Sequence, residues 1–237
     1  RFAHEVDTAT SLVWEGRRLV RRREARLGGL ALTTHDERPQ PGPETVTAIL
    51  DRVRAEGIDR LGWTKAALDL RARVTFLHRH AGEPWPDLGD TALAEDLETW
   101  LGPHLGRATG MDDLDRLDLA RVIRSVLPYP QAADLDRLAP GRLTVPSGRQ
   151  VPVDYSADTP TVSVRVQEMF GTTETPRIGD RPVRLELLSP ARRPVQITSD
   201  LAGFWTGSWI DVRKEMAGRY PKHHWPDDPA SAPPGKP

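Results

Sequence analysis

The sequence predicts an α+β chain, in which a helical unit is flanked by an N-terminal β piece and by a small C-terminal antiparallel β-sheet with short helices. Three observations predict this class. Extended runs around a turn or alternating apolar residues occur at the two ends of the chain, apolar residues recur at helical spacing in the middle, and Pro and Gly clusters separate the patterns. The predicted segments are the β piece at 1–40, the helical unit at 41–141, the C-terminal β unit at 142–225 and a Pro-rich tail at 226–237.

The N-terminal β piece is predicted from two extended runs, Ser11–Glu15 and Arg17–Arg26, which lie on either side of a turn at Glu15-Gly16. A third run at Leu30–Thr34 adds another strand. We expect these strands to be the end of a sheet that begins upstream.

The helical unit is predicted to contain four helices. The first begins near Pro43 and stops at Gly57. Its apolar stripe, at i, i+3, i+4 and i+7, consists of Val46, Ile49, Leu50 and Val53. Thr64 and Asp90 are placed to cap the second and third helices. The fourth ends before Pro128, since the residue that precedes a proline disfavours helix.

The C-terminal unit returns to the alternation of strands. The predicted strands are a hairpin at 143–155 and further runs at 162–166, 183–187 and 195–197. Asp200 and Asp211 are expected to begin two short helices. The Pro-rich tail is expected to be either disordered or draped over the surface.

Composition excludes several classes of protein. The chain has 237 residues and no Cys, which excludes a disulfide framework, thiolate metal sites and a cysteine nucleophile. Its apolar runs are much shorter than the roughly 20 residues of a membrane span. The lack of Cys favours a reducing compartment, so we expect a cytoplasmic protein. Because the chain begins with Arg1 rather than Met, we expect it to be a piece of a longer protein.

Charge is distributed unevenly although the net charge is only -1. Residues 16–27 hold six arginines and one glutamate, and residues 177–222 hold nine basic and five acidic residues. Residues 83–118 hold ten acidic residues and two arginines. Because the acidic segment repels phosphate, we expect contacts with a polyanion at the two ends of the chain.

The sequence predicts no catalytic residue and no metal site. His78 and His80 point to different sides of a helix, and His223-His224 lacks the spacing of a catalytic metal motif. The Gly-Lys pair at Gly235-Lys236 is not part of a phosphate-binding loop, and there is no Gly-x-Ser-x-Gly nucleophile elbow. This piece alone therefore cannot hydrolyse ATP.

Nucleic-acid contact is the chemistry that the basic residues favour. Of the 33 basic residues 29 are Arg, whose guanidinium binds phosphate in a bidentate manner and stacks on bases. The candidate binding residues are Arg17, Arg21, Arg23, Arg192, Arg193, Trp205, Arg213, Lys214, Arg219 and Lys222. Two other interpretations stay open. Alternate arginines also solvate the outer face of a strand, and a Trp within a helix is more often part of a core than a stacking platform.

Long irregular strings in the C-terminal half resemble the C-terminal region of HrpB-type ATP-dependent helicases of the DExH type. The strings are Leu187–Thr198 (LLSPARRPVQIT), Asp200–Trp205 (DLAGFW), Asp211–Met216 (DVRKEM) and Gly218–Pro229 (GRYPKHHWPDDP). Weaker likenesses at 143–148, at 167–176 and in the Arg-rich hairpin extend the resemblance over most of the chain.

This resemblance implies a parent protein with two RecA-like motor domains upstream, which would use ATP and magnesium to act on RNA or DNA. It also implies that residues 1–40 are the last strands of an OB-like unit. The motor is absent from this chain, so none of the family's catalytic residues can be assigned to a position here.

The resulting hypothesis is an accessory region that docks on the motor domains of the same chain and helps to bind single-stranded nucleic acid, with no membrane contact. The alternative is a protein-interaction or structural module that never touches nucleic acid, which the acidic middle favours. An independent metal hydrolase is a third and more distant hypothesis.

Overall fold

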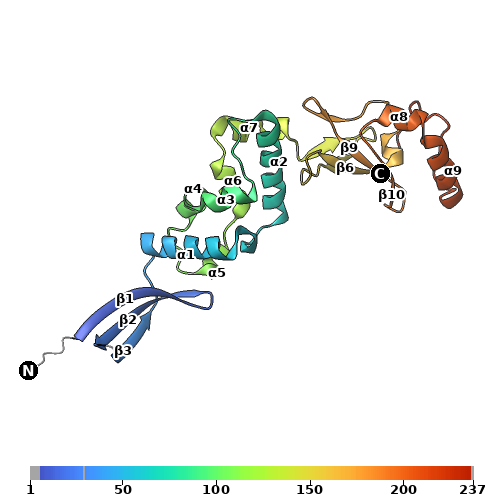
Figure 1. Cartoon of the computed structure of the whole chain (residues 1–237). Helices are drawn as coiled ribbons and strands as arrows, with labels where there is room; N and C mark the ends of the chain where they lie inside the picture. Colours follow the sequence, from blue (N-terminus) through green and yellow to red (C-terminus); the bar gives the residue numbers. More distant parts are fainter. Residues whose placement is uncertain (1–5, 29, 236–237) are drawn as a thin grey trace, which may run out of the picture. The chain divides into compact units, whose positions relative to one another are not determined.

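The computed structural model of this chain describes residues 6–28 and 30–235 (Figure 1). The chain packs into two compact units. Unit 1 comprises the chain up to Arg71 together with Pro86–Pro128, and unit 2 comprises Ala72–Trp85 together with the chain from Tyr129 onward. Helices and strands occur in both, so the predicted α+β class is confirmed. Packing places the N-terminal strands and the first helix in one unit, whereas periodicity assigns them to separate segments.

Unit 1 begins with a three-stranded antiparallel sheet in the order β1-β2-β3. Its strands are β1 (Val6–Glu15), β2 (Arg18–Leu27) and β3 (Leu30–Glu37). The first turn contains Gly16 at φ 59°, a conformation that glycine adopts without steric cost. All three predicted strands are confirmed. Strand β2 has the predicted length but is shifted by one residue, whereas β1 and β3 extend beyond their predicted bounds.

The helices of unit 1 follow the sheet. They are α1 (Pro43–Glu56), the first part of α2 (Lys65–Ala81), α3 (Asp90–Glu95), α4 (Leu97–Trp100), α5 (Met111–Leu114) and α6 (Leu119–Val126), with 3-10 turns at Ile58–Arg60 and Gly102–His104. In the predicted stripe of α1, Ile49, Leu50 and Val53 are buried and Val46 is half-buried. Helix α4 contacts both α1 and α6. The stop of α1 at Gly57 is confirmed.

The predicted caps have mixed outcomes. Thr64 accepts a hydrogen bond from the backbone N–H of Ala67 at 3.2 Å, so the cap of α2 is confirmed. The prediction that Asp90 caps the third helix is wrong, because Gly89 is the cap and the Asp90 carboxylate accepts from Arg71 instead. That helix is also interrupted at Asp96, which leaves the helical conformation and accepts a hydrogen bond from the Thr99 hydroxyl at 2.6 Å.

Unit 2 contains the rest of α2, helix α7 (Tyr129–Leu138) and the C-terminal sheets. Its strands are β4 (Arg142–Thr144), β5 (Gln150–Pro152), β6 (Thr161–Arg165), β7 (Arg177–Ile178), β8 (Arg181–Pro182), β9 (Arg184–Leu188) and β10 (Pro194–Thr198). A 3-10 turn spans Val166–Met169, and helices α8 (Leu201–Thr206) and α9 (Trp209–Arg219) follow the last strand. The Asp200 side chain accepts from Gly203 N–H at 2.9 Å, as predicted for a cap, whereas α9 begins two residues before Asp211.

The larger sheet of unit 2 has the order β10-β9-β6. Strands β9 and β10 are antiparallel, as are β4 and β5, which confirms both predicted hairpins. Strand β6, however, runs parallel to β9. The prediction of purely antiparallel pairing is corrected here, because the chain between β6 and β9 includes a 3-10 turn and the β7-β8 pair and is long enough for a crossover.

The Pro-rich tail is draped over unit 2 as far as Gly235. The backbone N–H of Gly171 donates to the carbonyl of Pro229 at 3.0 Å, and that of Gly235 donates to the carbonyl of Gln167 at 2.7 Å. Ala232 is buried. Of the two predicted states of the tail, the structure shows the ordered one.

No helix among the described residues has both the length and the apolarity to cross a membrane.

Candidate nucleic-acid interface

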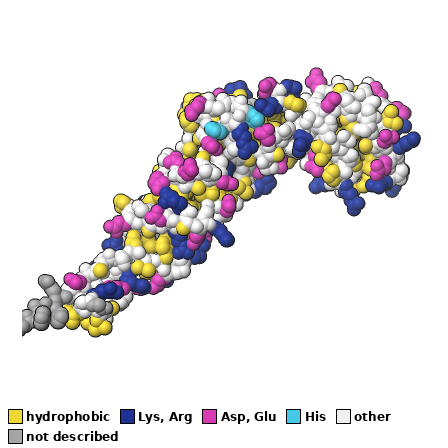
Figure 2. Space-filling model, in the orientation of Figure 1, with side chains coloured by type: hydrophobic (Ala, Val, Ile, Leu, Met, Phe, Trp, Pro, Cys, Tyr) yellow, Lys and Arg dark blue, Asp and Glu magenta, His cyan; other side chains and the backbone are white. Residues whose placement is uncertain are grey.

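Basic and acidic side chains are intermingled over much of the visible surface (Figure 2). Whether an arginine can bind phosphate therefore depends on whether a carboxylate already occupies its donors. The predicted binding residues differ in this respect, and each unit is considered by itself.

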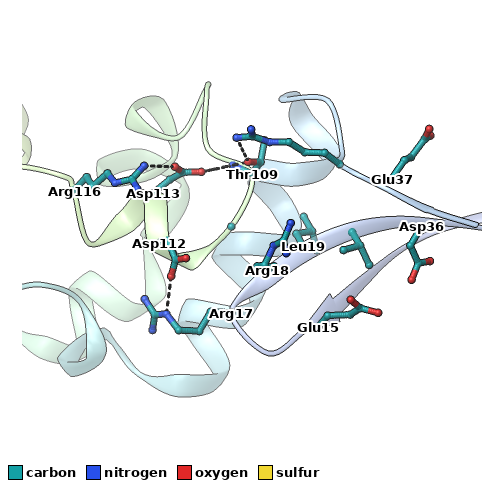
Figure 3. A pocket seen from close by; sticks show the side chains of 13 residues that line it. Glu15, Arg17, Arg18, Leu19, Asp36, Glu37, Thr109, Asp112, Asp113 and Arg116 are labelled. Atoms are coloured by element: carbon teal, nitrogen blue, oxygen red, sulfur yellow. Dashed lines mark hydrogen bonds and ion pairs between the residues drawn. The ribbon is translucent and has the colours of Figure 1, made fainter.

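Arg17 lies at the turn between β1 and β2, and its guanidinium is already paired. Its Nε donates to Asp112 at 2.9 Å (Figure 3), and its Nη2 donates to Asp115 at 2.5 Å. The hydrogen bond to Asp112 and the charge of Asp115 raise the pKa of Arg17. The backbone joins the same contact, since the N–H of Met111 donates to the carbonyl of Arg17 at 3.1 Å. Arg17 therefore holds the hairpin against α5.

Arg22 joins the three strands of the sheet, a role that sequence reasoning missed. Its guanidinium donates to both oxygens of Asp36 on β3, at 2.8 and 2.6 Å, and to Glu15 on β1 at 2.8 Å. The hydrogen bond to Asp36 raises the pKa of Arg22, and the same bond lowers the pKa of Asp36. The sequence could have indicated this role, because Arg22 lies on the strand between two strands that carry acidic residues, and opposite charges on neighbouring strands attract each other.

The other two candidate residues on β2, Arg21 and Arg23, differ in their exposure and in their ion pairing. Arg21 is half-buried, and its Nη2 lies 3.6 Å from Glu44 at the start of α1. Arg23 is exposed and has no ion-pair partner in the part of unit 1 that the structure describes. Of the three predicted arginines of the sheet, Arg23 is therefore the one whose charge is not compensated by a carboxylate.

A cavity of about 440 Å³ opens beside these arginines, within unit 1. Its lining carries both signs of charge (Figure 3). The charged lining residues are Glu15, Arg17, Arg18, Asp36, Glu37, Arg38, Asp112, Asp113 and Arg116. Because carboxylates line it as fully as guanidiniums do, this cavity does not present an anion site.

In unit 2, Arg192 and Arg193 lie in the turn between β9 and β10. The Ser189 hydroxyl accepts a hydrogen bond from the Arg193 backbone N–H at 3.1 Å, and the Ser189 N–H donates to the Arg193 carbonyl at 2.8 Å. Arg192 has φ 60°, a left-handed conformation that residues with a side chain rarely adopt. Both arginine side chains are exposed, and neither pairs with a carboxylate of the described chain.

The remaining basic candidates lie on α9 and directly after it. Arg213 pairs with Asp227, and Arg219 pairs with Glu215 at 3.1 Å. Lys214 and Lys222 are exposed and make no ion pair within residues 6–28 and 30–235.

A groove of about 140 Å³ brings the turn and the helix together. Arg193 and Ser189 line it from the β9-β10 side, and Arg219 and Tyr220 line it from the end of α9. Figure 2 shows basic side chains along the lower edge of this unit. The structure thus unites Arg193 and Arg219, whose sequence positions do not reveal this proximity.

Trp205 does not lie at this surface, and the prediction of a stacking platform there is wrong. The residue is 6% exposed, and its indole N–H donates to the carbonyl of Thr172 at 2.8 Å. Its ring packs against Phe170 and Trp209, at centroid distances of 5.9 and 5.4 Å. Helices α8 and α9 turn their aromatic side chains inward because these supply the core of a small unit.

His78 and His80 of α2 contact other residues of unit 2. His78 Nδ1 lies 2.8 Å from the carbonyl of Trp85, and His80 lies near Asp158. Across the described ranges, no three His, Asp or Glu side chains are grouped so that they could hold a metal ion.

The sequence of the chain was compared with protein families and with known proteins. Residues 100–229 match the family model described as ATP-dependent helicase C-terminal. The chain belongs to this family. It is 40% identical over 216 residues, 90% of its length, to the ATP-dependent RNA helicase HrpB of Escherichia coli K12, and it spans 27% of that relative. The resemblance inferred from the sequence is thereby confirmed.

Two solved structures extend the similarity of this helicase C-terminal region to its fold. The crystal structure of the E. coli DExH-box NTPase HrpB matches 98% of the chain with a TM-score of 0.79 and 37% identity, over 29% of that protein. The crystal structure of the E. coli DEAH/RHA helicase HrpB matches 93% of the chain with a TM-score of 0.68 and 36% identity, also over 29% of that protein.

Proposed function

We propose that this chain is an accessory region of an ATP-dependent helicase, that it docks on the motor domains of the same polypeptide and that it helps to bind single-stranded RNA or DNA. Its family membership supports the helicase assignment. The proposal assigns ATP and magnesium to the motor domains of the parent, since this sequence has no phosphate-binding loop. A cytoplasmic location is in keeping with the absence of Cys.

The nucleic-acid part of the proposal rests on a contrast between the two units. Arg17 and Arg22 of unit 1 already bind carboxylates, and a guanidinium engaged in this way has few donors left for phosphate. In unit 2, Arg192 and Arg193 are exposed, adjacent in the chain and without a carboxylate partner among the described residues. Unit 2 therefore offers two adjacent arginines without a carboxylate partner in one turn, whereas among the candidates of unit 1 Arg23 alone has none within the described residues.

Salt dependence tests this proposal. The dissociation constant of the full chain for a fluorescent single-stranded oligoribonucleotide is measured between low and high salt. Three or four phosphate contacts give a slope of log affinity against log salt of about -2 to -3, because each contact with a single strand contributes about -0.7. The double substitution Arg192→Ala, Arg193→Ala should reduce that slope by about 1.4.

The matched control is Arg137→Ala in the same unit. Arg137 is also exposed and pairs with Asp134 at 3.0 Å, but it lies on α7, outside the β9-β10 turn and the groove, so its loss should leave the slope unchanged. An affinity that is independent of salt would contradict direct electrostatic binding, and an equal effect of the control would contradict its assignment to Arg192 and Arg193.

A specific observation also favours a protein-interaction function. Ile197 on β10 and Ile210 on α9 are 57% and 64% exposed, and exposed apolar side chains serve protein contacts better than they serve phosphates. In this alternative, Ile197→Ser and Ile210→Ser abolish binding to the motor domains and leave the affinity for RNA unchanged. If the arginine pair alone affects RNA binding, the nucleic-acid function is favoured.

A further inference from the structure

The groove beside α9 has one wall that is fixed by hydrogen bonds. Ser189 is 2% exposed, and three bonds close the turn around it: from Arg193 N–H to its hydroxyl, from its N–H to the Arg193 carbonyl, and from Arg192 N–H to its carbonyl at 2.9 Å. This network holds the position of Arg193 before any ligand arrives, which lowers the entropy cost of binding.

Part of the groove lining, here called the floor, is apolar, and an aromatic residue also lines the groove. Val195 of β10 and Val212 and Met216 of α9 line it, and Met216 is buried. Tyr220 lies at the end of α9, where its N–H donates to the carbonyl of Met216 at 2.7 Å. A flat apolar ligand is therefore covered by carbon atoms on the floor and by an aromatic ring at the edge.

The rim of the groove carries charged groups that suit a phosphate and a base. Arg193 has no ion-pair partner in the described ranges, and Arg219 pairs only with Glu215, in a contact where both side chains are more than half exposed. Exposed pairs of this kind are weak, so Arg219 can exchange Glu215 for a phosphate at little cost. The Glu215 carboxylate is then an acceptor for the exocyclic amine of a base.

The size of the groove limits what it can hold. Its volume of about 140 Å³ is well below the roughly 300–1,000 Å³ of pockets for drug-sized ligands. It can therefore take one planar group of a longer chain, rather than a whole cofactor.

We propose that this groove is a subsite for one nucleotide of a single-stranded nucleic acid. Arg193 and Arg219 bind its phosphate, while its base lies over Val212 and Met216 against Tyr220. This inference rests on the proposed function and deepens it, because it adds recognition of a base to recognition of the phosphate backbone. The combination of an aromatic ring, guanidiniums and an apolar floor is the one that single strands require.

The test distinguishes recognition of the base from recognition of the sugar-phosphate backbone. The full chain is titrated with two fluorescent probes of equal length and charge, a single-stranded oligoribonucleotide and its fully abasic analogue. Tyr220→Ala should weaken binding of the normal oligonucleotide by about 5- to 150-fold, the range of one lost stacking contact, and leave binding of the abasic probe unchanged. Glu215→Gln is a second variant on the exposed side of the groove, and it should change the preference among bases without loss of folding.

The matched control is Tyr129→Ala, since Tyr129 lies on α7 of the same unit and is 86% exposed, outside the groove. It should affect neither probe. If both probes bind equally and Tyr220→Ala changes neither affinity, the subsite is refuted while electrostatic binding stands. If neither probe binds in a salt-dependent way, the proposed function itself fails. If an acidic peptide binds in the groove and neither oligonucleotide probe displaces it, the groove holds a protein side chain and the inference is overturned.

Discussion

Arg149 Nη1 donates to both carboxylate oxygens of Glu168 at 3.0 Å, and Glu168 is 1% exposed. Glu168 also accepts from the backbone N–H of Arg165 at 3.2 Å, and its carbonyl accepts from Ser147 N–H at 3.2 Å. These bonds join the β4-β5 turn to the 3-10 turn that follows β6. A buried carboxylate is tolerated in this place because its charge and its acceptor sites are satisfied.

Arg149→Ala should therefore destabilise the chain strongly. Removal of the guanidinium leaves the Glu168 carboxylate buried without its partner, for which the cost is about 3 kcal/mol. Urea unfolding followed by circular dichroism measures the loss. The control Arg137→Ala breaks an exposed pair and should cost far less. Near-equal midpoints for the two variants would show that Glu168 is not dependent on Arg149.

Gly110→Ala should separate the N-terminal hairpin from α5. A Cβ at this position would lie 3.2 Å from the carbonyl oxygen of Arg17, which is backbone and cannot rotate away. Crowding of this kind costs about 1–3 kcal/mol. The change is measured as a lower midpoint of urea unfolding.

The neighbouring Gly106 provides a control, because a Cβ there would meet open space. Gly106→Ala should leave the midpoint unchanged or raise it slightly, since alanine reduces the conformational freedom of the unfolded chain. A loss of stability in Gly106→Ala as large as in Gly110→Ala would contradict the assigned contact.

Much of the fold was predictable because the deciding signals are local. The apolar stripe of α1, its end at Gly57 and the turn at Glu15-Gly16 that precedes β2 each lie within a few residues of the element they specify. The pairing of Arg17 with Asp112 was not predictable in this way, because 95 residues separate the two side chains.

The candidate site was predictable only in part, for a related reason. Sequence spacing indicated that Arg192 and Arg193 lie at a hairpin tip, and the structure places them there. A sequence in which tryptophans alternate with basic residues fits both an exposed aromatic ring and a buried one. The burial of Trp205 therefore could not be predicted from the sequence. The groove that joins Arg193 to Arg219 depends on the packing of α9 beside β10, which no local pattern encodes.

Tyr155 should make stability depend on alkaline pH. Burial raises the pKa of its phenol above the usual value near 10, and its hydroxyl donates to the carbonyl of Pro140 at 2.8 Å. Because the folded pKa is raised, the contribution of Tyr155 is fully present below about pH 10 and is lost as the pH rises above that value. The midpoint of urea unfolding should therefore fall between pH 8 and pH 11.

Tyr155→Phe isolates this effect, since phenylalanine cannot ionise. At pH 8 the variant should be less stable by about 1 kcal/mol, because the Pro140 carbonyl loses its donor. Its midpoint should also fall less than that of the parent chain between pH 8 and pH 11. A parallel decline in both proteins would assign the alkaline transition to other groups.

Arg192→Gly should raise stability and weaken binding at the same time. Arg192 has φ 60°, and a residue with a side chain in this conformation carries a strain of about 1 kcal/mol that glycine does not. Strained residues persist where the surrounding structure fixes them, and they occur often at binding sites. Release of the strain should raise the midpoint of unfolding slightly, while the loss of the guanidinium should reduce the salt slope of RNA binding by about 0.7.

The adjacent substitution Ala191→Gly is the control. Ala191 has no positive φ, so glycine there should lower the stability, because it adds freedom to the unfolded chain, and should leave RNA binding unchanged. If Arg192→Gly lowered both stability and affinity, the left-handed turn would be a relaxed part of the fold, and its conformation would give no support to a role in binding.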